Sequence, residues 1–235
     1  MLKKINSKTI KLIKFYNFIN YNLIYNNKTI NRYKKDVFEI SGDKAEQLEK
    51  LKKSISNIKN CELKKNATNI VFADGNPKAK IMLIGEGPGA NEDLEGKPFV
   101  GRAGKLLDKM LASIKLDRTK VYISNVVNYR PPNNRKPEFS EIKRYSVFLR
   151  EHISIINPKI LILMGSTAME ALLGQKLKIS KERGKWKEII INQKTYLTMI
   201  TFHPAYLLRQ ADQKKNSWFD LKEIRKKIDE LSIQI

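Results

Sequence analysis

The stretch from residue 80 to residue 93 constrains the fold of this chain more than any other. It opens with the apolar run Ile81–Ile84 and ends in the turn Gly85-Glu86-Gly87-Pro88-Gly89. A short apolar run bounded by turn residues is typical of a strand buried on both faces of a parallel sheet. Glycine lets the backbone turn sharply and approach a ligand closely. The pattern therefore predicts a strand whose carboxyl end places Glu86 in a ligand-binding crevice.

Two other interpretations of this turn stay open at the level of the motif. A strand-to-helix turn without a function would also use glycine and proline. The spacing Gly85-x-Gly87-x-x-Ala90 also fits a dinucleotide-binding fingerprint. Against a dinucleotide site, Pro88 interrupts the phosphate-binding turn, and Asp108, the acidic residue about 20 positions on, lies in a helical pattern rather than at the end of a strand.

Charge and cysteine content limit the class of protein. The net charge of +22 over 235 residues indicates a polyanionic partner, with nucleic acid as the first candidate. The alternative is a genome rich in lysine and asparagine codons. The one cysteine, Cys61, excludes an internal disulfide and an all-cysteine metal site, and indicates a free thiol in a reducing compartment, the cytoplasm or nucleoid. No apolar run is long enough to span a bilayer.

The order of patterns along the chain predicts the domain organisation. Residues 1–40 form a basic, asparagine-rich extension with no acidic residue before Asp36, suited to a DNA-contacting arm, a membrane-surface helix or poorly ordered sequence. Residues 41–235 form one α/β domain. Strands are expected near residues 81–84, 121–127, 159–164 and 196–201, with helices before and between them, of which three are capped at Ser41, Ser140 and Ser166. Such alternation predicts a three-layer α/β/α domain with a central four-stranded parallel sheet.

Three polar residues should meet at the carboxyl edge of this sheet. Glu86 follows the first strand, Asn125 interrupts the apolar run of the second, and His203 follows the last. Phe99 lies between a proline and glycines, where it could present its ring to the same pocket. Asn125 and His203 could also serve the fold alone. A buried amide needs hydrogen-bond partners, and a lone histidine is more often structural than catalytic. Their convergence predicts a small, flat, polar pocket in a very basic protein.

Four segments carry a resemblance to a known family. They read Gly85-Glu86-Gly87-Pro88-Gly89, Lys97-Pro98-Phe99-Val100-Gly101-Arg102-Ala103-Gly104, Tyr122-Ile123-Ser124-Asn125-Val126-Val127 and His203-Pro204-Ala205-Tyr206-Leu207-Leu208-Arg209. In order and spacing, over roughly residues 45–230, the chain resembles a family 4 uracil-DNA glycosylase. The resemblance implies hydrolysis of the N-glycosidic bond of deoxyuridine in DNA, which starts base excision repair, and extrusion of the uracil from the base stack.

The resemblance also implies roles for the pocket residues. Phe99 would stack on uracil, and the Asn125 amide would read its O4 and N3–H edge, with Gly85 and Gly87 bordering the base. Cytosine reverses that donor and acceptor pair, so a fixed amide would reject it.

The remaining two pocket residues would carry the chemistry. Glu86 would position the attacking water, and His203 would donate to uracil O2 as negative charge develops. Two alternatives remain: a catalytically weakened or inactive DNA-binding accessory protein of the same fold, or a glycosylase for another deaminated base such as hypoxanthine.

Contacts to the nucleic acid would come from two loops. Arg130 and Arg135, in a stiff basic loop, would contact phosphates, while Leu207, Leu208 and Arg209 would push into the duplex and hold a phosphate. The expected partner is uracil-containing DNA, single- or double-stranded, bound by a monomer.

One feature of the family is missing from this sequence. Members normally carry a four-iron four-sulfur cluster on four cysteines, and the corresponding positions here are Ile58, Cys61, Tyr129 and Tyr145. One thiolate cannot hold such a cluster. We therefore expect no metal and no cofactor, with Ile58, Tyr129 and Tyr145 filling the vacated volume.

Overall fold

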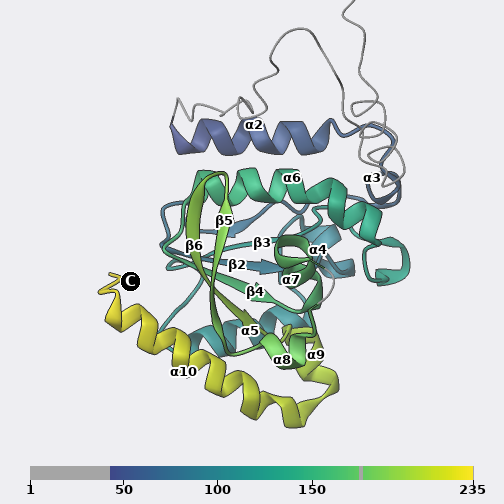
Figure 1. Ribbon diagram of the computed structural model, residues 1–235. Coiled ribbons are helices and arrows are strands. Elements are labelled where there is room, and N and C mark those ends of the chain that lie inside the picture. Colours follow the sequence, from purple (N-terminus) through teal and green to yellow (C-terminus); the bar gives the residue numbers. More distant parts are fainter. Residues whose placement is uncertain (1–42, 175–176, 235) are drawn as a thin grey trace, which may run out of the picture. The chain divides into compact units, whose positions relative to one another are not determined.

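The computed structural model describes residues 43–174 and 177–234 (Figure 1). The extension predicted for residues 1–40 and the cap predicted at Ser41 lie outside these ranges.

A six-stranded sheet forms the centre of the domain, in the order β1-β3-β2-β4-β6-β5. Its four inner strands are mutually parallel, as the sequence predicted. They are β2 (Ile81–Gly85), β3 (Tyr122–Asn125), β4 (Ile160–Met164) and β6 (Lys194–Thr201). Every residue of β2, β3 and β4 is buried, which explains why these strands read as continuous apolar runs.

Two antiparallel strands that the sequence patterns did not indicate extend the sheet at its edges. The two-residue strand β1 (Asp74–Gly75) pairs with β3, and β5 (Trp186–Ile191) pairs with β6. The predicted four-stranded sheet is therefore the parallel centre of a larger, mixed sheet.

Helices cover both faces of the sheet and give the expected three layers (Figure 1). One face packs against α6 (Phe139–Ile156) and α7 (Ser166–Leu173), and α2 (Lys44–Ser56) packs on the outside of α6, with α3 (Glu62–Asn66) next to it. The other face packs against α5 (Arg102–Ser113) and α10 (Lys214–Glu230). The sheet thus separates two hydrophobic cores, one on each face.

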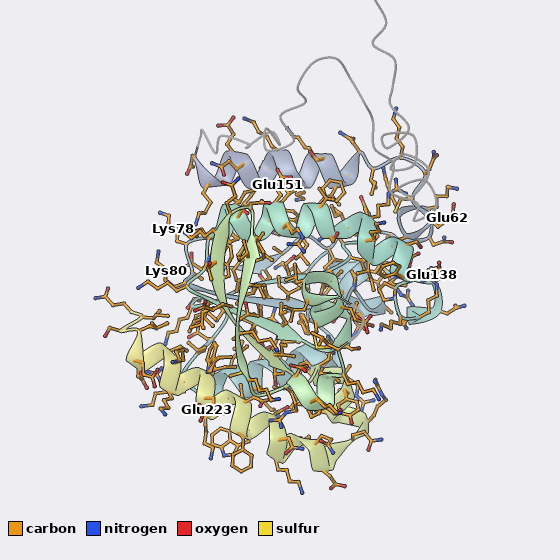
Figure 2. The ribbon with its side chains drawn as sticks, viewed as in Figure 1. Glu62, Lys78, Lys80, Glu138, Glu151 and Glu223 are labelled. Atoms are coloured by element: carbon orange, nitrogen blue, oxygen red, sulfur yellow. The ribbon has the colours of Figure 1, made fainter. Side chains whose placement is uncertain are left out.

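The carboxyl edge of the sheet is surrounded by short elements. They are α4 (Ala90–Glu95), α8 (Ile179–Glu182), α9 (Pro204–Arg209) and the 3₁₀ turns η1 (Pro132–Asn134) and η2 (Ala211–Gln213). In Figure 2, Glu138 marks the start of α6 on this side, whereas Lys78 and Lys80 mark the opposite edge, before β2. Among the helices that the structure describes, none combines the length and apolar character needed to cross a membrane.

Two of the predicted helix caps are wrong by one or two residues. Helix α6 begins at Phe139 with Glu138 as its N-cap, because the Glu141 carboxylate accepts a 2.7 Å hydrogen bond from the Glu138 N–H in a capping box. Ser140 therefore lies inside the first turn. Helix α7 begins at Ser166 itself, with Gly165 as the cap.

Candidate functional site

A cleft of about 590 Å³ opens at the carboxyl edge of the sheet. It is lined by side chains and backbone from the loops that follow all four parallel strands. Its lining includes Glu86, Gly87, Phe99, Asn125, Gly165, His203, Tyr206, Arg209 and Gln213. The structure therefore brings Glu86, Phe99, Asn125 and His203 together in one cleft, at the sheet edge where open α/β folds bind ligands.

Glu86 lies directly after β2, and its backbone is fixed by the neighbouring strand. The carbonyls of Gly85 and Glu86 accept hydrogen bonds of 3.0 and 3.2 Å from the N–H groups of Val126 and Val127. One carboxylate oxygen of Glu86, Oε2, accepts a 2.5 Å hydrogen bond from the hydroxyl of Thr167. Thr167 is fully buried in the first turn of α7. The Glu86 carboxylate is thus held by a residue of α7 through one of its two oxygens.

Asn125 ends β3, and its buried amide lines the cleft. Its Oδ1 finds no hydrogen-bond partner among the described residues. Buried polar atoms in folded proteins are nearly always paired, so an unpaired acceptor in a cleft indicates a ligand that donates to it.

Gly85 has a different position from the one expected of it. It lies in β2 opposite Asn125, behind the cleft lining rather than on it. A Cβ at residue 85 would come within 2.4 Å of Asn125 Oδ1 and 2.5 Å of Phe99 Cζ. The absence of a side chain at Gly85 therefore leaves the room that the Asn125 amide and the Phe99 ring occupy.

Phe99 is held in an unusual backbone conformation. Its φ of 57° is in the left-handed region, which is uncommon for an aromatic residue. The Arg118 guanidinium donates to the carbonyls of both Pro98 and Phe99 and forms ion pairs with Asp74 and Asp108. These contacts fix the loop so that the Phe99 ring lies beside His203, with 5.4 Å between ring centroids.

His203 follows β6 and serves as the N-cap of α9. Its Nδ1 accepts a 3.2 Å hydrogen bond from the backbone N–H of Ala205. A neutral imidazole that accepts at Nδ1 carries its proton on Nε2. Burial lowers the pKa of His203 to about 4, and the positive charge of Arg209 contributes to the same shift. At neutral pH the ring is therefore uncharged, and Nε2, which lacks a partner within the described chain, is a hydrogen-bond donor in the cleft wall.

The five residues expected to contact DNA differ in their surroundings. Arg209 is exposed at the cleft, and Arg130 donates to Asn134 Oδ1 at 2.8 Å. Arg135 forms a bidentate pair with Glu141, at 2.7 and 2.8 Å, so much of its charge is already neutralised.

Leu207 does not fit the expected role. Its side chain is only 1% exposed and belongs to the core between the sheet and α10. It cannot push into a duplex without leaving that core. Leu208, next to it, is 39% exposed and is the leucine available for such a contact.

The positions that correspond to the cluster cysteines form a packed aromatic group. Cys61 Sγ lies 3.4 Å from Tyr145 Oη, and Tyr145 and Tyr129 are both buried. Ile58 packs against the same core. Burial, and then the Cys61 thiol, raise the pKa of the Tyr145 hydroxyl well above its ordinary value. One thiol among two phenols and an alkyl chain does not fit the four-thiolate requirement of an iron–sulfur cluster.

The chain is similar in sequence to a known protein family and to several of its members. Residues 72–224 match the sequence model of the uracil DNA glycosylase superfamily. A type-4 uracil-DNA glycosylase of Sulfurisphaera tokodaii is 43% identical over 188 residues, which cover 77% of this chain and 84% of that protein. The type-4 enzyme of Thermotoga maritima is 45% identical over 150 residues (63% and 77%), and that of Archaeoglobus fulgidus 38% over 183 residues (76% and 92%). The chain therefore belongs to the uracil-DNA glycosylase superfamily and, within it, to the type-4 uracil-DNA glycosylases.

Proposed function

We propose that this chain hydrolyses the N-glycosidic bond between uracil and deoxyribose in DNA and leaves an abasic site. Uracil-DNA glycosylase is the activity in the names of its type-4 relatives. One observation in this chain carries the proposal furthest. Asn125 Oδ1 and His203 Nε2, an acceptor and a donor buried without partners in the described structure, belong to the same cleft, beside the Phe99 ring.

Asn125 and Phe99 recognise the base. Uracil in the cleft stacks on the Phe99 ring, and its N3–H donates to Asn125 Oδ1 while its O4 accepts from the Asn125 NH₂ group. Cytosine presents an acceptor at N3 and a donor at C4. The Asn125 oxygen would then face an acceptor, and the Asn125 NH₂ group would face a donor. A site built to pair with polar groups discriminates strongly against a ligand that cannot complete the pairs.

His203 stabilises the leaving group. When the bond between C1′ and N1 breaks, its electron pair moves onto uracil and places negative charge on O2. The Nε2–H of His203 donates to that oxygen. Because Ala205 holds the other ring nitrogen, the donor is oriented before the reaction starts.

Glu86 positions the nucleophile. With Oε2 bound to Thr167, Oε1 accepts a hydrogen bond from a water molecule and directs the oxygen of that water toward C1′. The water oxygen forms the new bond at C1′ as uracil departs with the electrons of the old one, and the products are an abasic site and free uracil.

The first experiment measures uracil release from an oligonucleotide with one uracil, single-stranded and in duplex, with alkaline cleavage as the readout for the abasic site. An otherwise identical oligonucleotide with cytosine at that position is the control. Binding without release would favour the accessory-protein alternative. Release of hypoxanthine in preference to uracil would favour an enzyme for another deaminated base.

Asn125→Asp tests the recognition step. A carboxylate accepts but does not donate, so it loses the contact to uracil O4. We expect uracil excision to fall by one to two orders of magnitude, because uracil O4 is left buried without a donor, which costs about 1–3 kcal/mol. The preference for uracil over cytosine should shrink with it. An unchanged preference would remove Asn125 from the recognition of the base.

The assembly state and the compartment belong to the same proposal. Because residues of one chain complete the cleft, we propose that a monomer acts on uracil-containing DNA. The buried free thiol of Cys61 suits a reducing compartment such as the cytoplasm or nucleoid. Sedimentation of the protein with a bound oligonucleotide tests the first point, with one protein per uracil as the expected stoichiometry.

A further inference from the structure

Helix α10 has two very different faces. Its inner face consists of Ser217, Asp220, Leu221, Ile224 and Ile228, all buried against the sheet. Its outer face carries Lys215, Trp218, Phe219 and Lys222, which recur at the three- and four-residue spacing of one helical face. The two aromatic rings are 44% and 57% exposed. Large aromatic side chains next to each other on a solvent-facing helix indicate a binding surface.

The lysines that share the first half of α10 with these rings are unpaired. Lys222 Nζ lies 4.5 Å from the centre of the Phe219 ring, in a cation–π contact. Within the described ranges, Lys214, Lys215 and Lys222 form no ion pair with an acid. Nearby Asp220 is buried and bound to Arg183. The surface therefore offers cations to a polyanion, together with flat apolar rings.

Further along the helix the acidic residues are engaged or lie beyond this segment. Asp229 pairs with Arg225, and Glu230 pairs with Lys227. Glu223, labelled on α10 in Figure 2, is the first exposed acid beyond Asp212; it lies four residues after Phe219 and so borders the aromatic pair on its far side. The first half of α10 is thus the strongly basic half.

This face begins at the cleft. Gln213, the N-cap of α10, lines the cleft together with Arg209. A helix rises about 1.5 Å per residue, so Trp218 and Phe219 lie roughly 8–9 Å further along the axis. Successive nucleotides of a stacked strand are about 3.4 Å apart, so this distance corresponds to two or three nucleotides from the base in the cleft.

We propose that the outer face of α10 binds a single-stranded segment of DNA flanking the flipped uracil. Trp218 and Phe219 stack on unpaired bases, and Lys215 and Lys222 contact phosphates. The inference rests on the proposed function, because it takes the cleft as the place of the uracil. Bases in a duplex are already stacked on each other, whereas those of a single strand are free to stack on aromatic side chains. The face therefore favours single-stranded over duplex substrates.

The double variant Trp218→Ala/Phe219→Ala tests the stacking. Affinity is measured by fluorescence anisotropy with a labelled uracil-free oligonucleotide, as a single strand and as a duplex, so the measurement does not depend on excision. We expect at least a tenfold loss of affinity for the single strand and less than a twofold loss for the duplex. Equal losses for both forms, or no loss for the single strand, would overturn the proposal.

Two matched controls separate this face from general effects. Ile190→Ala removes an exposed apolar side chain, 71% exposed on the edge strand β5, and should leave both affinities unchanged. Lys52→Gln/Lys53→Gln removes two charges from α2, across the sheet from α10 (Figure 1). It should affect the single strand less than Lys215→Gln/Lys222→Gln, which removes the same charge from the proposed surface.

A second measurement covers the case of a poorly folded double variant. The chain has two tryptophans, so the fluorescence that Trp218→Phe removes from the wild type belongs to Trp218. Addition of oligo(dT) should quench that component, and a duplex should not. No quenching by oligo(dT) would overturn the proposal and would leave this face as a surface for a different class of partner, such as a protein. Failure of the wild type to release uracil would count against the proposed function alone, since these binding assays are uracil-free.

Discussion

In the proposed mechanism, Glu86 and His203 each use one polar atom to keep their position and leave the other for the substrate. Glu86 is held at Oε2 by Thr167, and His203 is held at Nδ1 by the N–H of Ala205. Orientation is therefore fixed before a substrate arrives, which removes an entropic cost from the reaction. The residues that hold the pair are part of the site, although Thr167 does not line the cleft.

Thr167→Val tests the support of Glu86, because valine keeps the shape of the side chain and removes the hydroxyl. A hydrogen bond to a charged group contributes about 1.5–3 kcal/mol, so we expect kcat to fall by one to two orders of magnitude with KM changed by less than threefold. Single-turnover excision provides the measurement. Thr167→Ser, which keeps the hydroxyl, should recover most of the rate.

The control for this prediction is Thr198→Val. Thr198 is also a fully buried threonine, but its hydroxyl donates to Tyr196 O on the same strand. A loss of rate in Thr198→Val as large as that in Thr167→Val, or no recovery in Thr167→Ser, would show that Thr167 acts only through packing.

Sequence patterns predicted the residues of the cleft but not those that hold them. Glu86, Asn125 and His203 were identifiable because each is a polar residue at or near the end of an apolar run. Thr167 follows Ser166 and Gly165 at the start of a helix, where threonine has an ordinary structural explanation. Only the structure, which places β4 next to β2, reveals that its hydroxyl meets the carboxylate of Glu86.

At the scale of elements, α9 shows how a short helix divides adjacent residues between core and surface. It has only six residues, too few for a periodic pattern to indicate which leucine is buried. Leu207 packs in the core and Leu208 is exposed. Strand β5 escaped prediction for a similar reason: Ile189 and Ile191 are buried, but the exposed Ile190 between them hides the alternation.

The two leucines of α9 therefore give a matched pair of predictions. Leu207→Ala leaves a cavity in the core and should lower the free energy of unfolding by about 2–5 kcal/mol, measured by denaturant titration. Leu208→Ala should change that free energy by less than about 0.5 kcal/mol, as for a surface position, but lower kcat/KM on duplex DNA. A stability loss confined to Leu208→Ala would reverse the assignment of the two side chains.

At the scale of the whole molecule, a buried histidine links stability to pH. His152 is a buried residue of α6, with its Nε2 2.9 Å from the Oη of Tyr122 in β3 and its ring stacked on Phe72. Burial lowers the pKa of His152 to about 3. Between that value and about 6.5 the unfolded chain binds a proton that the native state does not, so stability is complete above pH 6.5 and falls as the pH decreases.

The expected loss from His152 between pH 7 and pH 5 is about 2 kcal/mol, from 1.36 kcal/mol for each pH unit below 6.5. His152→Gln removes this titration. Urea unfolding at the two pH values should show a smaller decrease in stability for the variant than for the wild type. His203, whose pKa burial lowers to about 4, keeps part of the dependence in both proteins. Equal decreases in the two proteins would exclude His152 as a source of the effect.

The arrangement of the cleft determines when during translation the site can be completed. Each of the four parallel strands is followed by, or ends in, one group of the site: Glu86 after β2, Asn125 in β3, Thr167 after β4 and His203 after β6. A chain emerging from the ribosome carries the first three long before the fourth, and β6 must settle beside β4 before the imidazole reaches its position. On the proposed roles, a chain that stops before β6 lacks both the imidazole and the end of the sheet that positions it, so we expect such a fragment to be inactive.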